Sequence, residues 1–539
     1  MSDTSTIRDF QTILSSFRFP VGSSFSESFA IGRFHKKFEE PDPSSVSRLS
    51  SECWDSWLEF DEGLREIHLP NGAWYKVREL LHRELMPVRF NQIQFPKGTE
   101  FDPTRGQNSI EARLCQSRWT CTSDNFDRMA AVCYSHKALK RAVRNRYAAW
   151  FAKGNFDISQ ATADKFLYSR FRGRSKDVGL DIFTWKLRNV CVITQGSRFS
   201  TVPKNNLVRR PINIEPFGNI ITQRAIGVHF RNELKRIFSL DLDTLASTHR
   251  HRIRYVDDIA TIDLKNASDS VSRSLCKFLL PKSIFNALEE TRSHMVLGPD
   301  GNYHPTKKIS SMGNGFTFEL MSLILNALCR VYDPSSSVFG DDIIINSKYA
   351  SQLISDLESV GFVVNTDKSF IDGPFRESCG ANYHLHEGYI ESYDFLYPES
   401  IGDCVVIWNK VFRLSKIYPS FKKLHDSLYR SLPHALRGGP SLDFQQRDML
   451  DFLTSGPWDS DVVADFPEFF VTIKSGGDRL NEVLRQRLLE LHYDPDDFRL
   501  VRGFAFESEL RSKTLKHLSS SLWAKYEMYL DAGGRTKDV

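Results

Sequence analysis

The residues 337–345, with the sequence SVFGDDIII, constrain the fold of this chain most strongly. Valine and isoleucine on both sides favour β-strands, and Gly-Asp-Asp between them is typical of a tight turn. The pattern therefore predicts a β-hairpin that carries Asp341 and Asp342 at its tip. A pair of divalent metal ions about 3.5–4 Å apart needs several carboxylates on a rigid support, which a hairpin tip provides. Alone, the same residues also fit an ordinary turn, so the rest of the chain has to decide.

Composition indicates a soluble globular protein of several domains. The chain has 539 residues, of which 41% are hydrophobic and 26% are charged. No stretch approaches the roughly 18 unbroken apolar residues of a membrane span, and the first residues lack the pattern of a secretory signal. We therefore expect no membrane association.

The nine cysteines are odd in number and irregularly spaced, which indicates reduced thiols in a cytosol. One cluster, formed by Cys115, Cys121, Cys133 and His136, is a candidate for a structural zinc site. The sequence spacing of Cys133 and His136 is typical of zinc ligands, but Cys115 and Cys121 are further apart in the sequence than zinc ligands usually are. A zinc site is the less favoured of the two interpretations.

Positive charge is concentrated in one region, between residues 137 and 210. This region contains 17 Lys and Arg but only 4 Asp and Glu, a local charge of +13 within a total of +4, so the remainder carries −9. Such asymmetry is expected of a nucleic-acid path. The region opens with an expected helix over 136–150.

An arginine-rich segment follows within this basic region. Arg170, Arg172, Arg174 and Lys176 alternate with Phe171 and a glycine. Arginine suits phosphates and phenylalanine can stack on unpaired bases, so we predict that these residues bind RNA. A surface loop without a ligand is the alternative.

The basic region ends in an expected Pro-containing ribbon over 196–216. Its cations Arg198, Lys204 and Arg210 bracket extended segments. Lys204 and Arg210 are placed to neutralise a triphosphate while its oxygens carry developing charge, and Arg198 is a further candidate for RNA binding.

Two adjacent carboxylates precede the next expected strand, and two more, six residues apart, follow it. Tyr255-Val-Asp-Asp258 looks like the metal-binding signature of reverse transcriptases, but it comes before the other motifs, so we interpret it as coincidental. The apolar segment 259–262 is expected to be a strand that delivers Asp263, a predicted metal ligand. Asp269, six residues later, is predicted to accept a hydrogen bond from a ribose hydroxyl, and Ser268 or Asp269 is expected to cap the following helix.

A Gly-Asn-Gly loop, Gly313 to Gly315, precedes an expected buried helix over 316–332. The glycines are predicted to let the backbone approach a ligand closely. Further on, the sequence indicates a helix closed by Gly361, a strand and turn over 362–370, and a small ribbon that begins at Phe375.

In this order, the motifs resemble those of the replicase subunit of small single-stranded RNA bacteriophages, the leviviruses. The matching residues are Thr201-Val-Pro-Lys-Asn205, Arg210 with Ile214-Glu-Pro216, Thr261-Ile-Asp-Leu264 with Ala267-Ser-Asp-Ser270, Ser311 to Leu320, Gly340-Asp-Asp342, Gly361-Phe362 with Asn365 and Lys368, and Phe375-Arg-Glu-Ser-Cys-Gly380. The resemblance covers about 200–380. Phe339 stands where the family more often has tyrosine, which removes a hydroxyl but no metal ligand.

The resemblance implies an α+β right-hand polymerase fold with an antiparallel-sheet palm, fingers and thumb. On it we expect an N-terminal region and fingers over 1–255, a palm over 256–400 with a fingers insertion near 273–308, and a helical thumb and C-terminal region over 401–539. It also implies RNA-directed RNA synthesis without a primer, in the cytoplasm of an infected bacterial host. The implied partners are the RNA template and nascent strand, ribonucleoside triphosphates, and host elongation factors Tu and Ts. In some members a small-subunit ribosomal protein and the RNA chaperone Hfq assist.

The mechanism predicted on this basis uses two Mg²⁺ ions, for which Mn²⁺ can substitute, held by Asp263, Asp341 and Asp342. Asp269 and Asn314, with Gly313 beside it, would read the ribose 2′-hydroxyl. Lys368 is the candidate proton donor to pyrophosphate, and an ordinary surface lysine is its alternative.

Two other functions compete with a polymerase that copies RNA into RNA. A reverse transcriptase would share the metal-binding carboxylates but would not need Asp269 to select ribose. An RNA-binding coat or assembly protein would explain the basic region but not three carboxylates in polymerase order.

Overall fold

The computed structural model describes residues 3–38, 45–64, 72–93, 114, 119–153, 178–204, 208–399 and 401–432. Within these ranges the chain mixes helices with small, mostly antiparallel sheets, so the predicted α+β class is confirmed. None of the helices in these ranges is long and apolar enough to cross a bilayer. The eight cysteines that they contain are free thiols.

The central sheet has three antiparallel strands in the order β5-β10-β9. Their bounds are β5 (Ile259–Ile262), β9 (Ser337–Phe339) and β10 (Asp342–Asn346). The predicted hairpin over 337–345 is therefore confirmed. Its apolar residues Val338, Ile343 and Ile345 are fully buried in the main core, and Ile344 is buried on the other side with Ile253 and Ile259.

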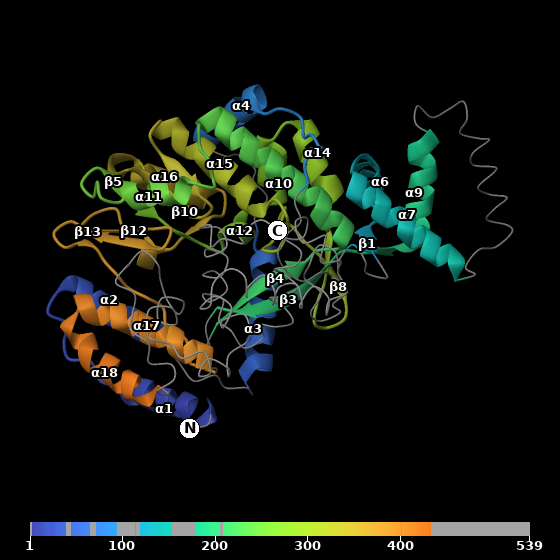
Figure 1. Cartoon of the computed structure of the whole chain (residues 1–539). Coiled ribbons are helices and arrows are strands. Elements are labelled where there is room, and N and C mark those ends of the chain that lie inside the picture. The colour runs from blue at the N-terminus through green and yellow to red at the C-terminus, as the bar shows by residue number, and fades with distance from the viewer. Residues whose placement is uncertain are drawn as a thin grey trace, which may run out of the picture.

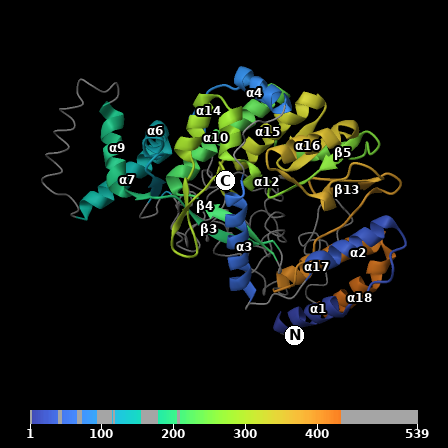
Figure 2. The ribbon, with the colours of Figure 1, turned by 180° about the vertical axis from the view of Figure 1, so that it is seen from behind.

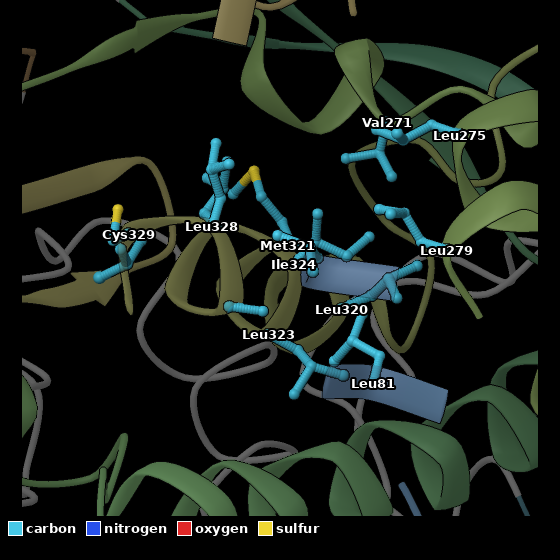
Figure 3. Close-up of a cluster of buried hydrophobic side chains, with 14 of the residues drawn as sticks. Leu81, Val271, Leu275, Leu279, Leu320, Met321, Leu323, Ile324, Leu328 and Cys329 are labelled. Atoms are coloured by element: carbon cyan, nitrogen blue, oxygen red, sulfur yellow. The ribbon is translucent and has the colours of Figure 1, made fainter. Parts of the chain in front are cut away.

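The helix that supports this sheet is α15 (Thr317–Tyr332), which matches the expected helix over 316–332. It is apolar on nearly every side, which is the pattern of a helix that belongs inside the core. Figure 3 shows its Leu320, Leu323 and Ile324 beside Leu81 of α4 (Gly72–Glu84) and the leucines of α13 (Arg273–Leu279). Helices α10 (Phe217–Phe238) and α16 (Ala350–Ser359) lie in the same part of the molecule (Figure 1).

The other sheets are small. A four-stranded sheet has the order β4-β3-β7-β8, in which only β3 and β7 are parallel. The bounds of the remaining strands are β1 (Trp119–Thr122), β2 (Cys191–Thr194), β3 (Ser197–Pro203), β4 (Arg209–Ile214), β6 (Leu264–Lys265), β7 (Met295–Leu297), β8 (Tyr303–Pro305), β11 (Val363–Val364), β12 (Phe375–Ser378), β13 (Ala381–His384) and β14 (Gly388–Tyr389). Strands β3 and β4 form the ribbon that the sequence predicts over 196–216.

Three helices form a separate group around their own core at one side of the molecule, on the right in Figure 1. They are α6 (Phe126–Ser135), α7 (Lys137–Ala152) and α9 (Val178–Val190), and they pack with Trp119 and Phe217. Helix α7 agrees with the helix expected over 136–150. It carries the first part of the basic region.

The two ends of the described chain meet. Helices α1 (Asp3–Ser16) and α2 (Phe25–Lys37) lie beside α17 (Ile401–Ile417) and α18 (Lys422–Ser431) in both views (Figures 1 and 2). The ring of Phe421 packs against Phe19 and Phe34. Because these contacts join residues about 400 positions apart, they cannot be predicted from periodicity near the N-terminus.

The remaining elements are short or stand between the larger groups. Helix α3 (Ser45–Glu62) runs past β3 and β4 in both views (Figures 1 and 2). The others are α11 (Leu245–Arg252), α12 (Ala267–Ser270), α14 (Lys282–Thr291), and the 3₁₀ turns η1 (Ser347–Tyr349), η2 (Thr366–Lys368) and η3 (Pro419–Phe421).

Candidate active site

The tip of the β9–β10 hairpin is a two-residue turn formed by Gly340 and Asp341. Gly340 has a positive φ of +65, and Asp341 has a negative φ. A positive φ at the first turn residue alone is the pattern of a type II′ turn. A Cβ atom on Gly340 would also lie 2.5 Å from Cε2 of Phe318. Glycine is therefore required here both by the backbone and by the neighbouring ring.

Helix α15 holds the hairpin rigidly. The backbone N–H of Gly340 donates to Oγ of Ser322 at 2.9 Å. The side chain of Asn326 donates to the carbonyl of Val338 and accepts from its N–H, each at 3.0 Å. The ring of Phe339 meets Phe318 edge-on, with ring centres 4.9 Å apart, so Phe339 is part of the packing that holds the hairpin.

Asp263 follows β5 directly and lies near Asp342. Ile262 and Ile343 form the last pair of the β5–β10 ladder, and Asp263 and Asp342 are the next residue on each strand. The two carboxylates are close enough for Asp263 to raise the pKa of Asp342 by repulsion. The structure thus brings together two carboxylates that are separated by 79 positions.

Asp263 is held by the segment that follows β11. The side-chain amide of Asn365 donates to Oδ2 of Asp263 at 2.6 Å, and the N–H of Asn365 donates to its carbonyl at 2.8 Å. Burial raises the pKa of Asp263, and repulsion from Asp341 and Glu377 adds to this, whereas Asn365 and the cation of Lys368 oppose it. Lys368 therefore lies within electrostatic reach of Asp263.

Burial raises the pKa of Asp342 to about 6, and repulsion from Asp341, Asp263 and Glu377 adds to the shift. A hydrogen bond from the backbone of Cys379 lowers it in part. Cys379 has φ +50, and Glu377 and Cys379 both belong to the ribbon that begins with β12. Both residues lie in the motif Phe375 to Gly380, but the sequence alone does not indicate a role for either.

A buried histidine ties this ribbon to the hairpin. Nδ1 of His249 lies 2.9 Å from Oγ of Ser378, and Nε2 lies 3.0 Å from Oγ of Ser337. Burial lowers the pKa of His249 to about 3, so the imidazole is neutral at physiological pH. It acts as a fixed polar link between β9 and β12.

The carboxylates at this tip are hard oxygen donors that repel one another, and a divalent cation would relieve that repulsion. Within the described residues no three His, Cys, Asp or Glu side chains converge as a metal cage. Mg²⁺ does not need such a cage, because it binds through one or two carboxylates together with phosphates and water. The donor chemistry of Asp263, Asp341 and Asp342 therefore fits Mg²⁺.

The predicted triphosphate ligands lie on the β3–β4 ribbon. Arg210 is exposed on β4 opposite Val202, and Lys204 is exposed just after β3. Arg198 is half-buried within β3. Arg170, Arg172, Arg174 and Lys176 lie outside the described residues.

The Gly-Asn-Gly loop packs on the end of this ribbon. Asn314 hydrogen-bonds through its side chain to buried Glu215. Gly313 has φ +106, and a Cβ atom there would lie 2.2 Å from the carbonyl oxygen of Asn213. The sequence predicted that this loop approaches a ligand closely. At Gly313 the close approach is to the protein's own backbone.

Asp269 is buried within α12, and its role as a helix cap was predicted wrongly. The N-cap of α12 is Asn266, and no side chain caps that helix. Ser272 caps α13, accepting from the N–H of Leu275. Asp269 instead forms an ion pair with Lys308, whose Nζ lies 3.1 Å from Oδ1.

The competing pair, Asp257 and Asp258, lies at the other end of β5. Both residues are exposed, and the carbonyl of Asp258 accepts from the N–H of Ser347, beyond the far end of β10. Asp257 is close enough to Arg376 to affect its pKa. This pair is therefore separated from the hairpin tip by the length of the strand.

The possible zinc cluster is described only in part. Cys121 and Cys133 are buried, and burial raises the pKa of both thiols. Cys115 lies outside the described residues. In the described ranges, no grouping of Cys and His side chains is arranged to hold a metal.

The family model described as RNA replicase, beta-chain, matches residues 106–440, which is more than half of the chain. The chain belongs to this family. The resemblance noted over about 200–380 is therefore confirmed, and it extends further in both directions.

Among individual relatives, this chain is 39% identical over 265 residues to the RNA-directed RNA polymerase subunit beta of Qbeta virus (strain MX1), a match that covers 46% of this chain and 44% of the relative. It is 41% identical to the corresponding subunit of Escherichia virus Qbeta, covering 40% of this chain and 38% of that one. For the beta chain of Escherichia phage MS2 the identity is 37%, over 35% of this chain and 36% of the relative. The chain thus spans less than half the length of these relatives.

Two solved structures share a distant likeness to this replicase family member. One is the RNA-dependent RNA polymerase of a human picobirnavirus, with 15% identity, a TM-score of 0.31, and coverage of 44% of this chain and 56% of that one. The other is titled an RdRp complex, with 10% identity, a TM-score of 0.35, and coverage of 87% and 49%.

Proposed function

We propose that this chain is an RNA-directed RNA polymerase, the catalytic subunit of an RNA phage replicase that copies single-stranded genomic and antigenomic RNA without a primer. The observation that carries the proposal is the proximity of Asp263 to Asp341 and Asp342 at the tip of the β9–β10 hairpin, where the three carboxylates repel one another. Family membership supports the same activity.

The metal ions in this proposal are two Mg²⁺, replaceable by Mn²⁺, held by Asp263, Asp341 and Asp342. When bound, they would lower the pKa of the 3′-hydroxyl of the growing strand and neutralise the pyrophosphate leaving group. The chain's part is to fix the carboxylates. Asn365 orients Asp263, Cys379 orients Asp342, and α15 anchors the turn that carries Asp341.

The incoming nucleotide is assigned to the β3–β4 ribbon and the loops beside it. Lys204 and Arg210 would offset the charge of the triphosphate, because cations there stabilise the charge that develops on its oxygens. Asp269 and Asn314, with Gly313, would select ribose. Lys368 would donate a proton to pyrophosphate, a role supported by its position near Asp263.

The RNA is assigned to the basic region over 137–210, with Arg170, Arg172, Arg174, Lys176 and Arg198 as contacts. We place the fingers within 1–255, the palm within 256–400 with an insertion near 273–308, and the thumb within 401–539. The proposed site of action is the cytoplasm of the infected bacterium, with elongation factors Tu and Ts as partners, and with a small-subunit ribosomal protein and Hfq as further ones.

A nucleotide-incorporation assay tests the activity. The full chain is given an RNA template, Mg²⁺ and either ribo- or deoxyribonucleoside triphosphates, with Asp263→Asn as the matched inactive control. Synthesis from ribonucleotides alone would support the proposal. Synthesis of DNA would indicate a reverse transcriptase, and RNA binding without synthesis in the presence of the host factors would indicate a coat or assembly protein.

A further inference from the structure

Helix α3 precedes the stretch matched by the family model, yet it reaches the carboxylate to which the proposed function assigns ribose selection. It is fixed to the β3–β4 ribbon by two side chains. Oγ of Ser50 lies 3.1 Å from Oγ1 of Thr201, and the thiol of Cys53 donates to the carbonyl of Arg209 at 3.6 Å. The next turns of the helix then face α12 and Lys308.

Lys308 is a buried cation enclosed by residues of two regions. Its side chain is 1% exposed, and Nζ lies 3.1 Å from Oδ1 of Asp269 and 3.7 Å from Oδ1 of Asp61 on α3. The same Nζ lies 3.9 Å from the ring centre of Trp57, also on α3. A buried ammonium group is tolerated only when it is paired in this way, and α3 supplies one of its two carboxylates and the ring that faces it.

Asp61 also fixes the backbone that carries Lys308. Its carboxylate accepts the N–H of Lys307 at 2.9 Å and the N–H of Lys308 at 3.1 Å. The lysine is therefore placed by its main chain as well as by its charge. This arrangement brings Nζ to Asp269 in one defined geometry.

Trp57 contacts Asp269 directly. Its side chain hydrogen-bonds to the Asp269 carboxylate, and an indole can only act as the donor. Burial raises the pKa of Asp269, whereas Lys308 and Trp57 oppose that shift. Both partners thus favour the ionised carboxylate, which accepts hydrogen bonds and donates none.

A cavity of about 330 Å³ opens beside this carboxylate. Its walls are formed by α3, β4 and the turn before α12, and they include Cys53, Trp57, Arg209, Pro211, Asn266 and Asp269. The volume falls in the range of small-molecule sites. A carboxylate has about four acceptor positions, so Asp269 can hold Lys308 and Trp57 and still accept a hydroxyl from the cavity.

We propose that Trp57, Asp61 and Lys308 are positioning residues that hold Asp269 ionised and oriented toward this cavity, so that α3 contributes to the choice of ribose over deoxyribose. This inference rests on the proposed polymerase function. A nucleotide without the 2′-hydroxyl would leave a buried acceptor unpaired, which is the condition under which a site rejects an analogue strongly.

The decisive variant is Trp57→Phe, which keeps an aromatic ring over Lys308 and removes only the N–H that reaches Asp269. Trp54→Phe is the matched control, since Trp54 stacks on Trp57 with ring centres 5.4 Å apart on the same helix. The measurement is kcat/KM for a ribonucleotide divided by that for the matching deoxyribonucleotide, with the full chain and an RNA template.

We expect Trp57→Phe to lower this ratio about tenfold, which the loss of one hydrogen bond to a charged group is enough to produce. Trp54→Phe should leave it unchanged. Asp269→Ala should lower the ratio further, and adding Trp57→Phe to Asp269→Ala should have no additional effect, because the two residues act through one carboxylate.

Equal losses for both sugars in Trp57→Phe would show that α3 has a purely structural role and would overturn the inference. Lys308→Met provides a second test of the same kind, with Lys308→Arg expected to restore part of the ratio. If the unsubstituted chain incorporates no nucleotide, the proposed function itself fails, and that outcome is distinct from an unchanged ratio in an active variant.

Discussion

Asp342 at the start of β10 and Asp263 directly after β5 follow the last pair of the ladder, Ile343 with Ile262. Asp342 is fixed by its pairing with Phe339, whereas the backbone of Asp263 is held by the N–H of Asn365 and the hydroxyl of Ser369. Their carboxylates are therefore held close together despite their mutual repulsion. Burial raises the pKa of both groups. Two neighbouring carboxylates with raised pKa values are a feature of functional sites, because such an arrangement weakens the fold unless it serves a ligand.

The first prediction concerns these ligands. Asp263→Asn and Asp341→Asn should each abolish nucleotide addition, because an amide is a poor ligand for Mg²⁺ and neither carboxylate is needed for the core. Circular dichroism and the melting temperature should stay close to those of the original chain. Synthesis near the original rate from either purified variant would rule out the proposed metal site.

The second prediction concerns stability and pH. The carboxyl of Asp342 has an ordinary pKa of 3.8 and a pKa of about 6 in the folded chain, so the native state binds more protons between these values. Its contribution to the free energy of unfolding is therefore most favourable below pH 3.8 and is lost as the pH rises through about 6. In the variant Asp342→Asn the side chain does not titrate, so this contribution to the free energy of unfolding is not lost as the pH rises.

We expect the variant to gain stability over the original chain by about 2 kcal/mol between pH 4 and pH 7, as measured by urea unfolding in a chelator. Added Mg²⁺ should reduce the difference in the free energy of unfolding between the two proteins at pH 7. The ion offsets the repulsion among carboxylates in the original chain, and this stabilisation is smaller in the variant. A difference that does not change with pH would show that Asp342 is not destabilised by its surroundings.

The sequence predicted those parts of the site that depend on local patterns. The hairpin follows from the strand-forming residues around Gly340, and Asp263 was expected at the end of a strand because an apolar segment precedes it. The buried helix α15 was recognisable from its continuous apolar run. Each of these signals lies within about 20 residues of chain.

Contacts between distant segments could not be predicted in this way. Lys308 reaches Asp269 and Asp61 across separations of 39 and 247 positions, and nothing in the local sequence distinguishes it from a surface lysine. For the same reason the expectation that Ser268 or Asp269 caps the following helix was wrong, since Asp269 is buried in an ion pair with Lys308 and Ser272 is the cap. The sequence indicates no role for Cys379, because its backbone contact with Asp342 depends on how the ribbon folds over the sheet.

A third prediction concerns the turn itself. Gly340→Ala should lower the free energy of unfolding by about 2–4 kcal/mol, the sum of a positive-φ cost and overpacking against Phe318. Gly361→Ala is the matched control, since Gly361 has φ +96 but no atom lies within 4 Å of an added Cβ. That control should lose only about 1 kcal/mol, from the backbone alone. Equal losses in urea unfolding would mean that Phe318 moves aside freely.

The fourth prediction concerns the template. Replacing Arg170, Arg172 and Arg174 together with alanine should weaken RNA binding and flatten its salt dependence, because fewer counterions are released. The slope of log affinity against log salt should fall by about 0.7 for each lost phosphate contact on a single strand. Replacement of the exposed Lys416, Lys422 and Lys423 controls for net charge and should change the slope less. An unchanged slope in the arginine variant would place the RNA elsewhere.

The last prediction decides between the two Asp-Asp pairs. Asp258 and Asp263 flank the extended strand β5, so five residues at roughly 3.3 Å each separate them by about 16 Å, too far to share one ion. Asp341 and Asp342 instead occupy the tip that faces Asp263. The double variant Asp257→Asn with Asp258→Asn should therefore retain Mg²⁺-dependent synthesis, whereas Asp341→Asn with Asp342→Asn should eliminate it. Both variants change two exposed or half-buried carboxylates to amides, so each controls for the charge change in the other. If synthesis instead disappeared only in the first variant, the metal site would lie at the opposite end of β5.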